Sequence, residues 1–247
     1  MNLLLDIGNS MVKWSIVENN CLTTMRNAKI DFKNPVKSVI ASLREVPECS
    51  VILCCSVRDE NFNKMLVTEI DLKFSKSLYF VDHNNICDHI KMDFASYPTI
   101  GMDRLTALIG AQYLSHKGCI VIDCGTAITI DAVGPDAIYM GGIILPGVDS
   151  MKKVFFSDTH VEEAIVAKEV TVFAGDTATA IHSGCFIAAS SAIDMACAQM
   201  RALSDQVDKV YITGGNASLF NEACSTSFIE EPMLLMQGLR KIATGIA

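Results

Sequence analysis

Several signatures of large protein classes are missing from this sequence. It has no Cys-x-x-Cys pair, no Cys and His set at zinc spacing and no Gly-x-Ser-x-Gly motif, so neither a zinc site nor a serine hydrolase is indicated. Glycine and proline are sparse, with 15 and 6 residues among 247, which excludes collagen-like and low-complexity sequence. No uninterrupted apolar run approaches the ~18 residues that a membrane span needs.

Basic residues are also scarce. The 20 Lys and Arg residues are outnumbered by 28 Asp and Glu residues, which gives a net charge of −8. Because no basic cluster offsets this charge, a nucleic-acid or anionic-membrane partner is not expected. Hydrophobic residues make up 50% of the chain, which excludes intrinsic disorder and predicts a compact, acidic, soluble protein.

Ten cysteines are present, but their context does not indicate disulfides. Most lie inside apolar runs such as residues 51–55 and 119–122, where a free cysteine behaves as a small buried hydrophobe. The N-terminus has no basic region, and Asp6 interrupts its only apolar stretch, so no secretory signal is indicated. We therefore expect reduced thiols and a cytoplasmic location.

One internal repeat organises the chain. Residues 3–10 and 119–126 are both buried-strand runs that end in Asp-x-Gly-(Asn/Thr), and a second β-rich stretch follows each of them. Coincidence is the alternative, because Asp-x-Gly is a common turn signal. A period of about half the chain predicts two related domains rather than a solenoid. We expect an N-terminal domain over 1–115 and a closely packed C-terminal domain over 116–247.

Hydrophobic periodicity predicts an α/β fold in which strands alternate with helices. We expect strands over 3–7, 12–17, 51–57, 77–81, 119–124, 128–133, 141–147 and 207–213. We expect helices over 35–46, 61–70, 103–114, 161–168 and 231–244, and one or two over 177–201.

The first Asp-x-Gly segment, residues 6–10, is a candidate phosphate-binding loop. A tight turn there presents several main-chain N–H groups, and Gly8 lets a large anion approach them. Lys13 can direct its ammonium at the same anion, and Asp6 offers the carboxylate oxygen that Mg²⁺ prefers. The alternative is an ordinary hairpin with a polar tip, although Asn-Ser is not a favoured hairpin pair.

The second segment, residues 123–129, has the same anatomy with hydroxyls added. Two such loops, one in each half, could face each other across a cleft and grip different phosphates of one nucleotide. Two facing carboxylates would repel each other unless cations sit there, so a metal at Asp6 or Asp123 is plausible.

Gly101-Met102-Asp103-Arg104 precedes a predicted helix. Asp103 could accept a hydroxyl proton, while Arg104 could grip a carboxylate or phosphate with its planar fork. The alternative is a charge-compensated helix start. Three glycine-containing stretches, at 141–147, 175–184 and 213–215, are explained nearly as well by close packing as by ligand binding.

The order and spacing of these motifs resemble those of the type III pantothenate kinases, also called the Bvg accessory factor family. The motifs are Asp-Ile-Gly-Asn-Ser at 6–10, Gly-Met-Asp-Arg at 101–104, Asp-Cys-Gly-Thr-Ala at 123–127, Gly-Gly-Ile-Ile-Leu-Pro-Gly at 141–147 and Thr-Gly-Gly at 213–215. The resemblance covers essentially the whole chain. It implies two ribonuclease-H-like domains of the actin-like ATPase superfamily, with mixed sheets flanked by helices, usually in a homodimer.

The resemblance also implies ATP-dependent phosphorylation of pantothenate to 4′-phosphopantothenate, the first step towards coenzyme A. Asp103 would be the general base, Asp123 would hold a monovalent cation (K⁺ or NH₄⁺), and Asp6 would hold Mg²⁺ with ATP. The matching ATP-binding residues are Asp6, Ile7, Gly8, Asn9, Ser10, Met11, Val12, Lys13 and Thr126. The matching substrate-binding residues are Phe94, Gly101, Met102, Asp103, Arg104 and, near the dimer interface, Thr177.

Two departures from the family pattern concern the substrate. Phe94 stands where the family usually has a tyrosine, and Asp176-Thr177 stands where Asn-Thr is usual. The first loses a hydroxyl, and the second adds a negative charge near an anionic substrate. Two alternatives stay open: a kinase of the same superfamily that acts on another small hydroxylated acceptor, and a nucleotide-binding regulator without turnover.

Overall fold

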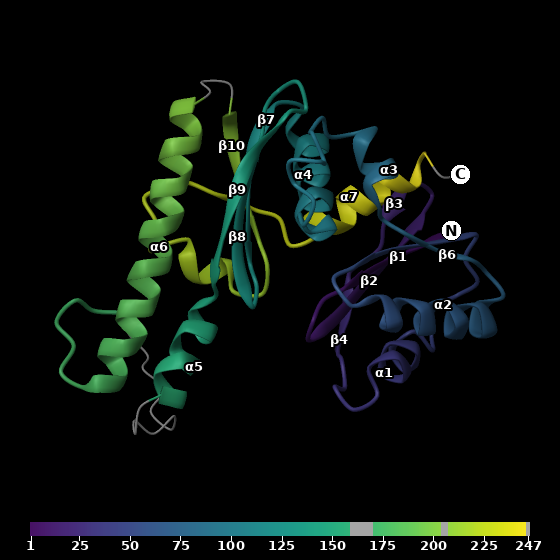
Figure 1. Ribbon diagram of the computed structural model, residues 1–247, viewed down its shortest axis with the longest axis horizontal. Coiled ribbons are helices and arrows are strands. Elements are labelled where there is room, and N and C mark those ends of the chain that lie inside the picture. The colour runs from purple at the N-terminus through teal and green to yellow at the C-terminus, as the bar shows by residue number, and fades with distance from the viewer. Residues whose placement is uncertain (159–169, 204–206, 246–247) are drawn as a thin grey trace. The chain divides into compact units, whose positions relative to one another are not determined.

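The computed structural model describes residues 1–158, 170–203 and 207–245. The chain divides into two compact units, each built on one mixed sheet flanked by helices (Figure 1). The first unit comprises residues 1–116, the short segment Ala137–Tyr139 and the chain from Met233 onwards, and the second comprises Lys117–Asp136 and Met140–Pro232. The predicted α/β class is thereby confirmed. The helix expected over 161–168 lies outside the described residues.

The sheet of the first unit has the strand order β3-β2-β1-β5-β6, and β4 also pairs with β2. Its strands are β1 (Asn2–Ile7), β2 (Met11–Glu18), β3 (Cys21–Leu22), β4 (Arg26–Lys29), β5 (Val51–Ser56) and β6 (Leu78–Phe80). β1 runs antiparallel to β2 and parallel to β5. One face buries Leu3, Leu5 and Ile52 against α1 (Pro35–Ser42) and α2 (Glu60–Phe74), which lie along the same side of the sheet (Figure 1).

The other face of this sheet is covered by two helices from distant parts of the chain. α4 (Met102–Ser115) packs on α7 (Leu234–Ala243), and α7 also contacts β1 and β5. α7 buries Leu234, Met236 and Leu239 there. We expected this terminal helix in a C-terminal domain over 116–247, whereas its apolar face is buried in the first unit. The short helix α3 (His83–Cys87) precedes α4.

The sheet of the second unit has the order β11-β10-β7-β8-β9. Its strands are β7 (Gly118–Cys124), β8 (Ala127–Val133), β9 (Tyr139–Pro146), β10 (Val207–Thr213) and β11 (Ile229–Glu230). β7 is antiparallel to β8 and parallel to β10, as β1 is to β2 and β5. The repeated segments 3–10 and 119–126 therefore occupy equivalent places, at the central hairpin of each sheet.

The helices of the second unit are α5 (Val148–Asp158), α6 (Thr177–Leu203) and the 3₁₀ turn η1 (Ala217–Phe220). The region expected to form one or two helices is a single helix, α6. Its inner face buries Ala189, Ile193 and Cys197 in the core with β7, β8 and β10. Within the described ranges, α6 alone is long and apolar enough to cross a membrane, but 44% of that apolar window is buried inside the protein.

The remaining predicted strands and helices are present with ends that differ by a few residues. β3, β4 and β11 were not expected because strands of 2–4 residues are too short to show a period. α5 was not expected from the sequence. All ten cysteines are free thiols, as expected.

Candidate active site

The first predicted loop joins β1 to β2 and is a hairpin. Asp6 and Lys13 are direct partners across the two strands, and the Lys13 ammonium lies 3.8 Å from the Asp6 carboxylate. The Gly8 N–H donates to the carbonyl of Met11 at 2.9 Å. The loop is thus the turn of a hairpin, which places a carboxylate and an ammonium side by side next to the turn.

The tip of this hairpin is exposed at Asn9 and Ser10. Its main chain is held from two sides: Arg58 donates to the Asn9 carbonyl at 3.0 Å, and the Ile30 N–H donates to the Ser10 carbonyl at 2.9 Å. Arg58 was not identified from the sequence, because it belongs to the loop after β5. It adds a second positive charge beside the turn.

Two of the predicted ATP-binding residues can act only through their main chain. The side chains of Ile7 and Val12 are fully buried in the core against α1 and α2. They fix the two strands on either side of the turn, so any contact with a phosphate must come from their main-chain groups.

The Gly-Met-Asp-Arg motif forms the first turn of α4, with Gly101 at the N-cap position. The Asp103 carboxylate accepts a hydrogen bond from the Arg104 N–H at 2.9 Å. A methyl group at Gly101 would collide with the Asp103 carboxylate. Glycine therefore makes room for an acidic side chain that folds back over the start of its helix, where the helix dipole favours negative charge.

A buried thiol lies close to the elements that carry Asp6 and Asp103, the two predicted site carboxylates of the first unit. Cys55 is the partner of Asp6 across β1 and β5, and its sulfur lies 4.0 Å from the hydroxyl of Thr106, one turn beyond Asp103. Burial, and then the charges of Asp6 and Asp103, raise the pKa of the Cys55 thiol well above its usual range. Cys55 thus contacts both the strand that carries Asp6 and the helix that carries Asp103.

Two aromatic contacts involve the predicted substrate-binding residues Phe94 and Arg104. The ring of Phe94, the predicted substrate contact, stacks on His83 with centroids 4.5 Å apart. The hydroxyl beside Arg104 belongs instead to Tyr139, 3.4 Å from a guanidinium nitrogen. Local spacing gave no signal for Tyr139, because it follows Arg104 by 35 residues.

In the second unit, Asp123 lies where three loops meet at one end of the sheet. It is the strand partner of Thr213, and Gly214, with a φ of +96°, packs so closely that a Cβ there would lie 2.5 Å from the Asp123 carboxylate. The Gly147 N–H donates to the carbonyl of Thr126 at 3.0 Å. The predicted cation and ATP contacts, Asp123 and Thr126, are thus brought together with the Thr-Gly-Gly motif.

The start of α5 adds polar groups to this end of the second sheet. The Ser150 hydroxyl donates to the carbonyl of Thr126 at 2.8 Å. Lys152 lies 2.7 Å from Asp149, and this contact is the main reason why the pKa of Asp149 is lowered, with a further hydrogen bond from Asn216. Sequence reasoning missed these residues, because α5 itself was not expected.

Thr177, the predicted substrate contact in the second unit, is the exposed first residue of α6. The preceding Asp176 accepts hydrogen bonds from the N–H and the hydroxyl of Thr179, at 2.8 Å and 2.7 Å. Both bonds lower the pKa of Asp176, and the bond from the main-chain N–H has the larger effect. The unexpected acidic residue is therefore the N-cap of α6.

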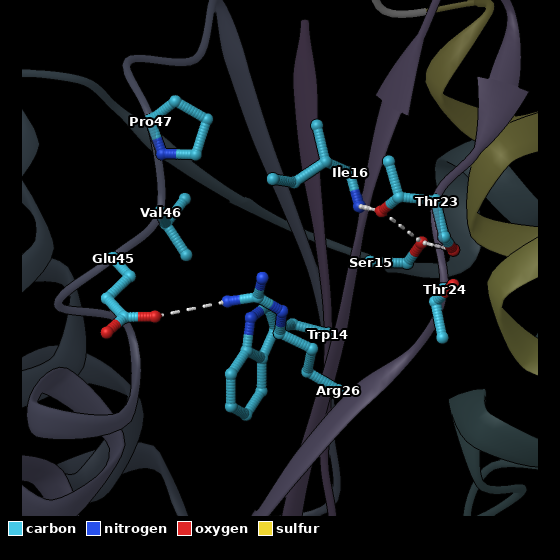
Figure 2. Close-up of a pocket in the computed structure, with 9 residues that line it drawn as sticks. All are labelled: Trp14, Ser15, Ile16, Thr23, Thr24, Arg26, Glu45, Val46 and Pro47. Carbon is cyan, nitrogen blue, oxygen red and sulfur yellow. Dashed lines mark hydrogen bonds and ion pairs between the residues drawn. The ribbon is translucent and has the colours of Figure 1, made fainter.

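A cavity of about 260 Å³ opens in the first unit, but none of the predicted site residues lines it. Figure 2 shows Trp14 and Ile16 on one side and Val46 and Pro47 on the other. Several of its polar groups are bonded within the lining: the Ser15 hydroxyl donates to the Thr23 carbonyl at 2.8 Å, and the Arg26 guanidinium lies 3.5 Å from the Glu45 carboxylate. It is also smaller than a typical ligand pocket, so we do not regard it as the active site.

Comparison with known proteins gives a consistent assignment. Residues 2–199 match the family model described as type III pantothenate kinase. A protein of that name from Ectopseudomonas mendocina is 28% identical over 247 residues, covering 97% of each chain. Another, from Azoarcus sp., is 29% identical over 251 residues, covering 100% of this chain and 92% of that protein.

Solved structures show the fold. A conserved putative Baf family transcriptional activator from Campylobacter jejuni has a TM-score of 0.63 and 23% identity, covering 99% of this chain and 98% of that one. A putative 2-dehydro-3-deoxygalactonokinase protein from Sinorhizobium meliloti has a TM-score of 0.58 and 13% identity, covering 100% and 99%. At these identities the likeness concerns the fold alone, and it agrees with the predicted α/β architecture of two mixed sheets flanked by helices.

Proposed function

Because the chain belongs to the type III pantothenate kinase family, we propose that it transfers a phosphate group from ATP to the 4′-hydroxyl of pantothenate, the first step towards coenzyme A. The observation that carries this proposal is the pair of carboxylates in the first unit. Asp6 lies at the β1–β2 hairpin and Asp103 at the start of α4. Cys55 links the two places, because it is the strand partner of Asp6 and its sulfur lies 4.0 Å from the hydroxyl of Thr106, one turn beyond Asp103.

Asp103 is the proposed general base. Its carboxylate is only partly buried, and the Gly101 N-cap leaves it room at the helix start. A carboxylate here accepts the proton of the attacking hydroxyl as the new O–P bond forms, and such a base contributes ~10²–10⁴-fold. The other proposed substrate contacts are Gly101, Met102, Arg104, Phe94 and Thr177.

The β1–β2 hairpin is the proposed site for the ATP phosphates. The exposed tip supplies main-chain N–H groups, and Lys13 and Arg58 supply positive charge. Asp6 fits a Mg²⁺ ion that arrives with ATP, because Mg²⁺ at phosphates commonly uses one or two protein carboxylates. No group of three or more metal-ligating side chains occurs among the described residues, which suits an ion shared with the nucleotide. The ion would neutralise charge on the transferred group.

Asp123 is the proposed monovalent cation ligand and Thr126 a contact to ATP. The carboxylate of Asp123 lies close to Gly214 and offers the hard oxygen atoms that such a cation prefers. A K⁺ or NH₄⁺ ion would offset the negative charge that a nucleotide brings.

A homodimer is part of the proposal, and α6 supports it. Five uncharged, exposed residues recur on its outer face at spacings of four and three: Gly184, Ala188, Ser191, Met195 and Ala198. This is the spacing of a helix–helix seam, and small residues let two helices approach closely. Thr177 begins the same helix, so a dimer along α6 places it near the interface. We further propose a cytoplasmic location, with neither a membrane nor a nucleic acid as partner.

The test measures ADP release from ATP and Mg²⁺ with and without pantothenate, first in K⁺ and then in Na⁺ buffer. We expect turnover that requires both pantothenate and K⁺. Asp103→Asn should lower kcat by at least ~10²-fold without changing the thermal unfolding midpoint. The matched control is Asp71→Asn, which removes an exposed carboxylate from α2 of the same unit and should retain wild-type activity.

One result would overturn the proposed activity, and another would overturn only the role of Asp103. ATP binding without pantothenate-dependent ADP release would leave either another small hydroxylated acceptor, to be sought with a substrate panel, or a regulator without turnover. Full activity of Asp103→Asn would leave the kinase assignment standing but would show that Asp103 is not the general base.

A further inference from the structure

Tyr139 belongs to the first unit although it is the first residue of β9, the edge strand of the second sheet. Two main-chain hydrogen bonds hold it there: the Lys91 N–H donates to the carbonyl of Ala137 at 2.8 Å, and the Tyr139 N–H donates to the carbonyl of Lys91 at 3.0 Å. Ala137 adopts a φ of +63°, which a residue other than glycine rarely does. The strained turn at Ala137 therefore places Tyr139 against the first unit.

The Tyr139 side chain lies between Arg104 and Tyr97. Its ring is only 7% exposed and meets the ring of Tyr97 edge-on, with centroids 5.2 Å apart and an interplanar angle of 82°. Its hydroxyl lies 3.4 Å from a terminal nitrogen of Arg104 and accepts a hydrogen bond from it. Main chain and ring packing thus fix the phenol, and the phenol in turn touches the guanidinium.

We propose that Tyr139 is a positioning residue, whose hydroxyl holds one nitrogen of Arg104 so that other donors of the guanidinium face the carboxylate of the acid substrate. The inference rests on the proposed function. A guanidinium has five N–H donors in a rigid fork, and a two-point grip on a carboxylate uses two of them. A phenol oxygen is an uncharged acceptor, so it sets the plane of the fork without itself competing with the substrate as an anion.

The experiment compares two acceptors that share the reacting hydroxyl. Pantothenate carries the carboxylate, and pantothenol carries a primary alcohol in its place. Tyr139→Phe keeps the ring and removes only the hydroxyl. We expect its KM for pantothenate to rise by about tenfold, the scale of a hydrogen bond to a charged group. The KM for ATP, kcat and the thermal unfolding midpoint should stay close to wild type. For pantothenol the KM, or the inhibition constant if it is not phosphorylated, should be unchanged.

Tyr97→Phe is the matched control. It also removes a tyrosine hydroxyl, but the Tyr97 contact with Tyr139 is made by the rings, so the KM for pantothenate should remain at the wild-type value. An unchanged KM for pantothenate in Tyr139→Phe, or an equal rise for both acceptors, would overturn the inference. These failures differ from failure of the proposed function, in which the wild-type protein itself does not phosphorylate pantothenate.

Discussion

At the scale of single residues, Asp176 shows how local bonding determines what a charge does. In the sequence, this residue adds a negative charge near the expected site of an anionic substrate. Here it caps α6, with both oxygens bonded to Thr179, and the positive end of the helix dipole offsets its charge.

We therefore expect Asp176→Asn to change the KM for pantothenate by less than ~3-fold, because asparagine caps a helix about as well as aspartate. Asp176→Ala removes the cap and should lower the thermal unfolding midpoint. Steady-state kinetics and thermal unfolding of both variants check these outcomes. If the asparagine variant bound pantothenate ~10-fold more tightly, charge repulsion would exceed the effect of the cap, and this explanation would be wrong.

The same cap has a pH dependence with a defined sign. The pKa of Asp176 is lower in the folded protein than its ordinary value, so the folded state favours the carboxylate. Its stabilising effect is present at neutral pH and is lost as the pH falls through the lowered pKa of the folded state. The difference in unfolding midpoint between wild type and Asp176→Ala should therefore shrink in acid.

At the scale of secondary-structure elements, the crossing of α4 and α7 supports the start of α4. A methyl group at Gly238 would collide with the carbonyl oxygen of Thr106, and one at Gly110 would collide with the carbonyl oxygen of Leu234. Backbone meets backbone at this crossing, so the two helices cannot separate without moving the turn that carries Asp103.

We expect Gly238→Ala to cost ~1–3 kcal/mol of unfolding free energy, as overpacking generally does, and to lower kcat because α4 must shift. Denaturant titration and steady-state kinetics measure the two effects. The control is Gly175→Ala, since nothing lies within 4 Å of a Cβ placed at Gly175, and it should be close to wild type. A Gly238→Ala variant with unchanged stability would mean that the crossing is looser than described.

Most of the helices and strands themselves could be predicted from the sequence, but contacts between distant elements could not. The strands that end near Asp6 and Asp123 were predictable, because buried runs and Asp-x-Gly turns are local patterns. The place of α7 was not, because its apolar stripe shows only that it is buried and not on which sheet. Tyr139 was missed for the same reason: Ala137 and Lys91 bring it to Arg104 by contacts between distant segments.

At the scale of the whole molecule, the outer face of α6 bears on assembly. Its seam contains no charge, and Met195 in its middle is 62% exposed. Contact with a second copy would remove this apolar surface from water, which is favourable in proportion to the area buried. Since Thr177 lies on the same helix, loss of the proposed dimer should also weaken substrate binding.

We expect Met195→Glu to convert a dimer into monomers, because two like charges would face each other in an apolar seam, and to raise the KM for pantothenate through Thr177. Sedimentation velocity reports the mass and steady-state assays report the KM. Met65→Glu is the matched control: Met65 is 60% exposed on α2 of the first unit, so the same change in charge there should leave both quantities unaltered. A wild-type protein that sediments as a monomer, or a Met195→Glu variant that remains dimeric, would show that this face of α6 does not form the interface.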